Sequence, residues 1–235
     1  MRFLAALLIV CAAAGFSEVY RSGCEYDYPP FCYVTDTGEA EGFSVELLNA
    51  SLEEMGHEAR YEVGPWAEVK SWLAEGTVDC LPLVGRTPER EDTFDFTFPY
   101  MTQTGAVVVR TGCDSVFSAE DLSHLTIGVM SGDNAEEFVL REGHGDSLVT
   151  TPTFEDALIM LSDGEVDAVV LQRLVGVRLL NELSLNNLKI LDWPLTEFRQ
   201  DFCFAVREGD AELLEVLNEG LARVMVDGTY SHLHA

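Results

Sequence analysis

The chain has 235 residues, which is enough for one large domain or two smaller ones with their own hydrophobic cores. Its hydrophobic content of 47% and charged content of 23% are those of a globular protein and exclude a disordered one. Asp and Glu number 41 against 14 Lys and Arg, so the formal net charge is −27. A surface this acidic repels polyanions, and nucleic acids and anionic membrane surfaces are therefore not expected as partners.

The N-terminus carries the pattern of a secretory signal peptide. One early charge at Arg2 precedes an apolar run over residues 3–14, and small residues follow up to Ser17. The run is shorter than the roughly 20 residues that span a bilayer. We therefore expect residues 1–17 to be removed and the mature protein to be periplasmic or extracellular.

Short apolar runs alternate with amphipathic stretches in the rest of the chain, a pattern typical of α/β proteins. In the first half this pattern predicts strands near residues 18–23, 59–63 and 79–83, and helices over residues 47–56 and 66–74.

The segment after the third of these strands suggests a site for an anion. The strand runs to Gly85, and Thr87-Pro88 then predicts the start of a helix, because Pro is tolerated at the first helical position. The unpaired N–H groups of a helix start attract anions, and Arg90 on the first turn adds a fork that can grip a carboxylate. A plain connection with a solvated arginine explains the segment equally well.

A similar order of elements restarts after Thr104. It predicts these strands and helices: strands over residues 106–110, 126–130, 166–171 and 202–206, and helices over residues 118–122, 135–141, 154–164, 172–183 and 211–226. Ligands bind beyond the carboxyl ends of strands in open α/β sheets, and in clefts between domains. Two α/β halves therefore predict two lobes that close on a small molecule.

Cysteine and histidine usage indicates neither a metal site nor a cofactor. No C-x-x-C pair occurs and the histidines are scattered. Five cysteines follow the signal peptide, so at least one is unpaired in a monomer. Cys24 and Cys32 are close enough in sequence for a bridge to be considered, whereas Cys80 and Cys203 lie in apolar runs and are expected to be buried as small hydrophobic residues.

Six short motifs occur in a fixed order along nearly the whole mature chain. They are Gly23-x-x-x-x-Tyr28-Pro-Pro-Phe31 with Gly42-Phe43, Gly76-x-x-Asp79, Thr87-Pro-Glu-Arg90, Phe94-Asp-Phe-Thr-x-Pro-Tyr100, Gly164-x-x-Asp167-Ala168 and Asp227-Gly-Thr-Tyr230. Together they resemble bacterial extracellular solute-binding proteins of family 3, the amino-acid-binding periplasmic proteins with a two-lobed Venus-flytrap fold.

The resemblance implies an α/β fold of the periplasmic-binding-protein type II class, with two crossover hinge strands near residues 104–108 and 199–203. Residues 18–104 plus 204–235 would form lobe one, and residues 105–203 would form lobe two.

The resemblance also implies which residues bind the ligand. Arg90 matches the arginine that grips the ligand α-carboxylate, and Thr87 belongs to the same motif. Tyr28 and Trp66 fall where the family places aromatic walls, although Trp66 fits a core anchor at a helix start nearly as well. Two further residues fall at the lobe-two helix start that completes the carboxylate site: Asp133 and Asn134.

Two positions depart from the family pattern. Gly85 stands where many amino-acid binders carry a hydroxyl residue. Gln172 stands where an acidic residue commonly receives the ligand ammonium, and its neighbour Arg173 is positive. Because a buried ammonium without a carboxylate partner is unfavourable, a carboxylate with a neutral or second acidic end fits better than a plain α-amino acid. Alternatively, Gln172 only caps the next helix.

We therefore expect a monomeric, non-enzymatic receptor for a small carboxylate-bearing ligand, amino-acid-like or an organic acid. Its partner would be an ABC transporter permease or a downstream signalling domain. Residues 82–90, 130–134 and 172–176 resemble flytrap modules of membrane sensor proteins, and both partners stay open.

Two other functions stay open. One is a flytrap-fold enzyme such as a cyclohexadienyl-type dehydratase, for which Glu25 and Asp27 are candidate general acids, although both fit solvated loop acids better. The other is a protein-interaction module that binds no small molecule.

Overall fold

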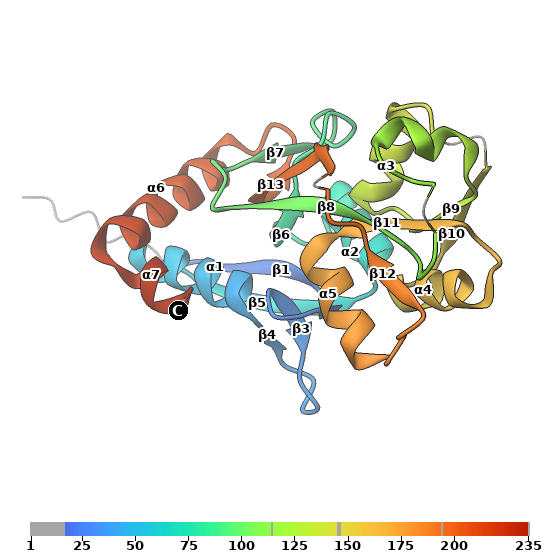
Figure 1. Cartoon of the computed structure of the whole chain (residues 1–235). Coiled ribbons are helices and arrows are strands. Elements are labelled where there is room, and N and C mark those ends of the chain that lie inside the picture. Colours follow the sequence, from blue (N-terminus) through green and yellow to red (C-terminus); the bar gives the residue numbers. More distant parts are fainter. Residues whose placement is uncertain (1–16, 114, 145–146, 194, 235) are drawn as a thin grey trace, which may run out of the picture.

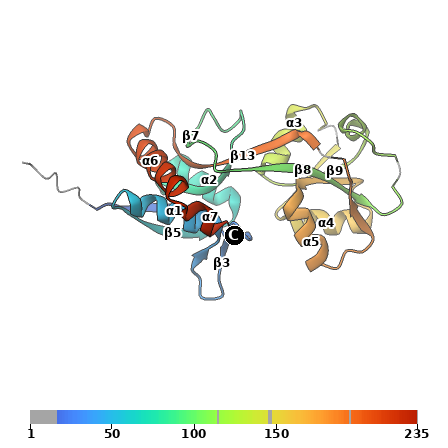
Figure 2. The same cartoon turned by 60° about the vertical axis from the view of Figure 1, so that its left-hand side comes forward.

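The structure is a computed structural model that describes residues 17–113, 115–144, 147–193 and 195–234. The predicted signal peptide therefore lies outside the described residues, apart from Ser17. Two α/β lobes lie side by side and are joined by two long strands (Figures 1 and 2). No helix within the described ranges has the length and apolar character to cross a membrane.

Lobe one is the part of the molecule that holds both ends of the described chain. It contains β1 (Val19–Glu25), β2 (Asp27–Tyr28), β3 (Cys32–Val34), β4 (Ala40–Glu41), β5 (Glu58–Gly64), β6 (Cys80–Gly85), β7 (Phe94–Phe96), α1 (Phe43–Glu54), α2 (Trp66–Glu75), α6 (Ala211–Asp227) and α7 (Thr229–Leu233). Lobe two contains β9 (Ile127–Met130), β10 (Leu148–Thr151), β11 (Ala168–Gln172), β12 (Leu188–Ile190), the 3₁₀ helix η1 (Ala119–His124), α3 (Asn134–Arg141), α4 (Phe154–Asp163) and α5 (Arg173–Glu182).

Two strands, β8 (Met101–Arg110) and β13 (Leu195–Arg207), run through both lobes (Figure 2). The main sheet has the order β10-β9-β11-β8-β13-β6-β1-β5, with β8 and β13 paired antiparallel in its middle. β8 continues into lobe two against β11, and β13 continues into lobe one against β6. This arrangement confirms the predicted two-lobed α/β fold with two crossover strands, and the proposed lobe boundaries after residues 104 and 203 fall inside these strands.

Local sequence signals explain most helix boundaries. The predicted stripe of α4 is buried as expected, at Phe154, Ala157, Leu158 and Leu161. The helix ends at Gly164 with a φ of 85°, a left-handed conformation that glycine adopts without strain. Ser118 and Asp121 form the capping box of η1, as the predicted capped helix required.

The helix predicted after Thr87-Pro88 is wrong. The chain makes consecutive turns there, in which the N–H groups of Arg90 and Glu91 donate to the Thr87 carbonyl, and Phe94 already begins β7. A segment this short has no room for a helix with an anion-attracting N-terminus. Arg90 is thus presented from a turn, and any anion must be held by its side chain.

The packing of α1 against α6 generates a first prediction. Gly220 on α6 approaches α1 so closely that a methyl group there would collide with the carbonyl oxygen of Ser51. Gly220→Ala should therefore lower the free energy of unfolding by about 1–3 kcal/mol, even though alanine favours a helix by about 1 kcal/mol over glycine. Urea denaturation measures this change, with exposed Glu215→Ala on the same helix as control. Equal stability of the two variants would contradict the close contact.

Candidate functional site

A pocket lies between the lobes. It is lined by Glu25, Tyr28, Trp66, Leu83, Gly85, Arg90, Asp133, Asn134, Gln172 and Phe202. All the site residues predicted from the sequence line it except Thr87. A second pocket shares Glu25 and Trp66 with it and extends toward Asp27 and Glu155.

The strand ends position this pocket. Glu25, Gly85 and Gln172 are the last residues of β1, β6 and β11, and Asp133 precedes α3 just after β9. Polar side chains at the carboxyl ends of strands face the ligand-binding edge of α/β sheets. The two lobes therefore bring these edges together from opposite sides.

Arg90 is buried in the junction with 4% of its surface exposed. Its Nε donates to Glu137 Oε1 at 2.9 Å, Nη1 to the Gly85 carbonyl at 3.1 Å and Nη2 to the Gly132 carbonyl at 3.3 Å. The guanidinium carbon lies 5.1 Å from the centroid of the Trp66 ring, within reach of a cation–π interaction. Because a guanidinium has five N–H donors, one on each terminal nitrogen has no acceptor among the described residues. Two such donors match the bidentate geometry of a carboxylate.

Several donors of lobe one converge on the start of α3. The Gly132 carbonyl accepts from Trp66 Nε1 at 2.8 Å and from Lys70 Nζ at 2.9 Å, in addition to Arg90. Thr87 Oγ1 donates to Glu137 Oε2 at 2.7 Å, and so Thr87 braces the partner of Arg90 from outside the pocket. Through these contacts the two lobes touch across a closed cleft.

Gln172 precedes α5, but its side chain makes no capping hydrogen bond to that helix. Its side-chain amide donates to Asn134 Oδ1 and, at 3.4 Å, to Asp133 Oδ1, while its own Oε1 is buried without a partner among the described residues. Asp133 caps α3 by accepting from the Ala135 N–H at 2.9 Å. Burial raises the pKa of the Asp133 carboxyl, an effect that this backbone N–H and the Arg90 charge partly offset.

The structure gives a reason for the glycine at position 85. A Cβ atom at Gly85 would collide with the side-chain amide of Asn134 from lobe two. The side chain of Asn134 therefore occupies the space that a hydroxyl side chain would fill at position 85.

Glu25 is a pocket residue that the sequence interpretation assigned to a solvated loop. No donor among the described side chains reaches its carboxyl group, and burial, with Asp133 and Asp27 nearby, raises its pKa to about 8. The signal that would have found it is its place as the last residue of β1. Asp27 lines the adjoining pocket, 3.8 Å from Arg178 of lobe two.

Some buried polar side-chain atoms of the pocket have no hydrogen-bond partner among the described residues, and these atoms can accept hydrogen bonds. Besides Gln172 Oε1, the hydroxyl of Tyr28 is buried without a partner in the described parts of the chain. Phe202 was not predicted, because a hinge strand shows no pattern that distinguishes its pocket-facing side chains. Together with Asp133, these groups suit a ligand that donates hydrogen bonds.

Comparison with known proteins agrees with this geometry. The model of bacterial extracellular solute-binding proteins, family 3, matches residues 20–235. The chain belongs to this family. The L-cystine-binding protein TcyJ of Escherichia coli strain K12 is 28% identical over 216 residues, which cover 90% of this chain and 79% of that protein. A probable histidine-binding protein of Neisseria gonorrhoeae is 29% identical over 230 residues, which cover 95% and 84%.

Solved structures are similar over nearly the whole chain. A histidine kinase sensor domain with similarity to periplasmic binding proteins matches with a TM-score of 0.82 and 32% identity, covering 93% of this chain and 94% of that one. An ancestral arginine-binding protein bound to arginine matches with a TM-score of 0.80 and 29% identity, covering 92% and 96%. An ancestral amino-acid-binding protein described as a precursor of cyclohexadienyl dehydratase matches with a TM-score of 0.75 and 27% identity, covering 92% and 93%. The resemblance to family 3 and to flytrap sensor modules is confirmed.

The raised pKa of Glu25 generates a prediction for stability against pH. The group titrates near 4.5 when unfolded and near 8 when folded, so the folded state binds more protons between these values. Its contribution to stability is therefore lost as the pH rises from about 4.5 to about 8. Glu25→Gln should melt like the wild type near pH 4 but at least about 2 °C higher at pH 8.

Thermal unfolding followed by circular dichroism across this pH range measures the effect. Glu53→Gln, an exposed carboxylate on α1, is the control and should leave the profile unchanged. A Glu25→Gln profile parallel to the wild type at every pH would show that the Glu25 carboxyl is solvated.

Proposed function

We propose that the protein is an extracytoplasmic receptor that closes its two lobes on an amino acid and releases it unchanged. The observation that carries this proposal is the pairing of charges in one cleft. Arg90 keeps two unused N–H donors for a carboxylate, and Asp133 lies in the same pocket with no ion-pair partner among the described residues. A zwitterion is the small molecule that satisfies both.

The ammonium of the ligand has a carboxylate to meet at Asp133. Position 172 lacks the acidic residue that the family pattern leads one to expect. The Gln172 amide donates toward Asp133, however, and the Asp133 carboxylate at the beginning of α3 can therefore take the place of that residue. A cation that binds beside Asp133 offsets the free-energy cost of burying its charged carboxylate. A second acidic end, by contrast, would meet Asp133 as a like charge. The proposed ligand therefore carries an ammonium group at its second end, in place of the neutral or acidic group that the sequence led us to expect.

The side chain of the ligand is proposed to be basic. The adjoining pocket is lined by Glu25, Asp27 and Glu155 and has aromatic walls from Trp66 and Phe154. Carboxylates attract a guanidinium, imidazolium or ammonium, and aromatic faces stack on such cations. The relatives named for arginine and histidine support the same class of ligand.

Ligand binding would shift an equilibrium between open and closed lobes. Arg90 belongs to lobe one and Asp133 to lobe two, so both ends of the zwitterion are held only when the cleft is shut. We propose that the closed form is read by a transporter permease or by a signalling domain. Relatives of both kinds support these partners. The signal-peptide pattern and the extracellular family support a site of action beyond the cytoplasmic membrane.

One observation supports an enzyme as the alternative function. A carboxyl group with a pKa of about 8 stays protonated at neutral pH, and Glu25 could thus act as a general acid beside the carboxylate-binding Arg90. Turnover of a carboxylated cyclohexadienol by the purified protein, lost in Glu25→Gln, would favour this alternative over the receptor.

A thermal-shift screen of the amino acids tests the receptor. A basic amino acid at a hundredfold excess over its Kd should add about 2.7 kcal/mol, or roughly 5–10 °C, to the melting transition. Arg90→Lys keeps the charge but loses the bidentate fork, and should reduce the shift strongly. Stabilisation by dicarboxylates, with none by basic amino acids, would contradict the proposed ligand. No shift across the panel would favour a protein-interaction module.

A charge relocation tests the role of Asp133. Asp133→Asn keeps a good N-cap residue on α3 but removes the charge, and should weaken binding of the stabilising amino acid at least about tenfold, the effect of a lost charge-assisted hydrogen bond. Adding Gln172→Asp returns a carboxylate to the end of β11 and should recover much of that affinity. Titration calorimetry measures both variants.

The single variant Gln172→Asp is the matched control for the added charge. Unchanged affinity in Asp133→Asn would exclude Asp133 as the ammonium acceptor. Equal loss of affinity in Asp133→Asn and in the double variant Asp133→Asn/Gln172→Asp would show that Asp133 acts through the fold of α3 and not through its charge.

A further inference from the structure

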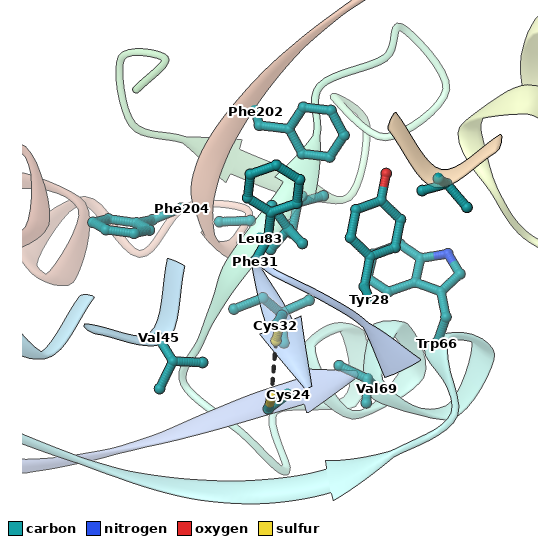
Figure 3. Packing of buried hydrophobic residues seen from close by; sticks show 14 of the residues in the cluster. Cys24, Tyr28, Phe31, Cys32, Val45, Trp66, Val69, Leu83, Phe202 and Phe204 are labelled. Atoms are coloured by element: carbon teal, nitrogen blue, oxygen red, sulfur yellow. Dashed lines mark hydrogen bonds between the residues drawn. The ribbon is translucent and has the colours of Figure 1, made fainter. Parts of the chain in front are cut away.

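We propose that Cys24 and Cys32 form a disulfide that fastens the pocket loop at its two ends. Cys24 lies on β1 and Cys32 on β3, and their sulfur atoms are 2.8 Å apart. Both residues are buried, with 0% and 1% of their surface exposed. Figure 3 shows the two side chains pointing at one another between the strands. This inference does not depend on the identity of the ligand.

The geometry leaves little to change for bond formation. A disulfide joins its sulfurs at about 2.05 Å, so the two atoms are less than 1 Å from bonding distance. The other described cysteines have different neighbours. Cys80 Sγ faces the Arg21 carbonyl at 4.0 Å, and Cys113 Sγ lies 3.6 Å from the Ser115 hydroxyl. Cys24 and Cys32 are therefore the pair that the fold brings together.

Bond formation needs an oxidant of the disulfide class, such as oxidised glutathione or a thiol–disulfide oxidoreductase. The two thiols give up two protons and two electrons as the sulfur–sulfur bond forms, and the oxidant's own disulfide is reduced to two thiols. Burial raises the pKa of the Cys32 thiol, which makes it a poor nucleophile once the protein has folded. The exchange therefore takes place while the chain folds, in an oxidising compartment.

The bridge spans residues 25–31, the loop that brings Glu25 and Tyr28 to the pocket. Glu25 follows Cys24 directly, and the Tyr28 ring lies beside Trp66 above the two sulfurs (Figure 3). Closing a loop removes conformations from the unfolded chain and from any opened form of the lobe. The disulfide would thus hold the two pocket residues in place while the cleft is empty.

Peptide mapping tests the bond directly, because no Lys or Arg lies between Arg21 and Arg60. Trypsin therefore releases residues 22–60 as one peptide that contains both cysteines. The protein is refolded in a mixture of oxidised and reduced glutathione, then denatured and alkylated before and after reduction. We expect this peptide to be lighter by two hydrogen atoms and unalkylated before reduction, and to carry two alkyl groups afterwards.

The remaining cysteines provide internal controls. Peptides that contain Cys80, Cys113 and Cys203 should be alkylated under both conditions. Two alkyl groups on residues 22–60 without prior reduction would overturn the proposal, and so would a bridge from Cys24 or Cys32 to any other cysteine.

The thermal transition provides a second, independent readout. Reductant should lower the melting temperature of the wild type by roughly 5 °C, because the unfolded chain regains the freedom that the loop removed. The double variant Cys24→Ala/Cys32→Ala should not respond to reductant, whereas Cys113→Ser should respond like the wild type. A reductant effect that persists in the double variant would contradict the assignment.

Discussion

The closed arrangement of the two lobes depends on the burial of one permanently charged group. The Arg90 guanidinium lies in the junction and cannot lose its proton, so its charge must be matched by acceptors from both sides. Lobe one supplies the Gly85 carbonyl, and lobe two supplies the Gly132 carbonyl and the Glu137 carboxylate. The indole of Trp66 covers the group and also bonds to the Gly132 carbonyl. Closure of the cleft therefore provides acceptors for three of the five N–H donors of Arg90 and leaves two for a ligand.

Charge placement in the cleft explains how the two departures from the family pattern are compatible with amino-acid binding. The carboxylate missing at Gln172 has a counterpart at Asp133, on the neighbouring element of the same lobe. The side chain missing at Gly85 makes room for Asn134, which then bonds to Gln172. The two departures thus belong to one altered network across the cleft, and a substitution considered alone is a poor guide to ligand class.

The sequence predicted elements whose signals are local. The stripe and the C-terminal Gly164 of α4 and the capping box of η1 follow from side chains within one or two turns. The helix after Thr87 failed because its length is set by the return of the chain to β7, a tertiary constraint. Glu25, named as a candidate general acid, was judged to fit a solvated loop better, for a related reason. Its environment includes Asp133 and Glu155 of the other lobe, and the contact of Asp133 with Gln172 joins residues that are 39 positions apart in the sequence.

The central claim is that protein charges hold both ends of a zwitterion. Titration calorimetry with three forms of the amino acid that stabilises the protein most tests it directly: the free amino acid, its methyl ester and its N-acetyl derivative. The ester cannot pair with Arg90 and the N-acetyl form cannot pair with Asp133, so each should bind at least about a hundredfold more weakly, a loss of about 2.7 kcal/mol. A derivative that binds as tightly as the free amino acid would show that the corresponding charge is not recognised and would contradict the account.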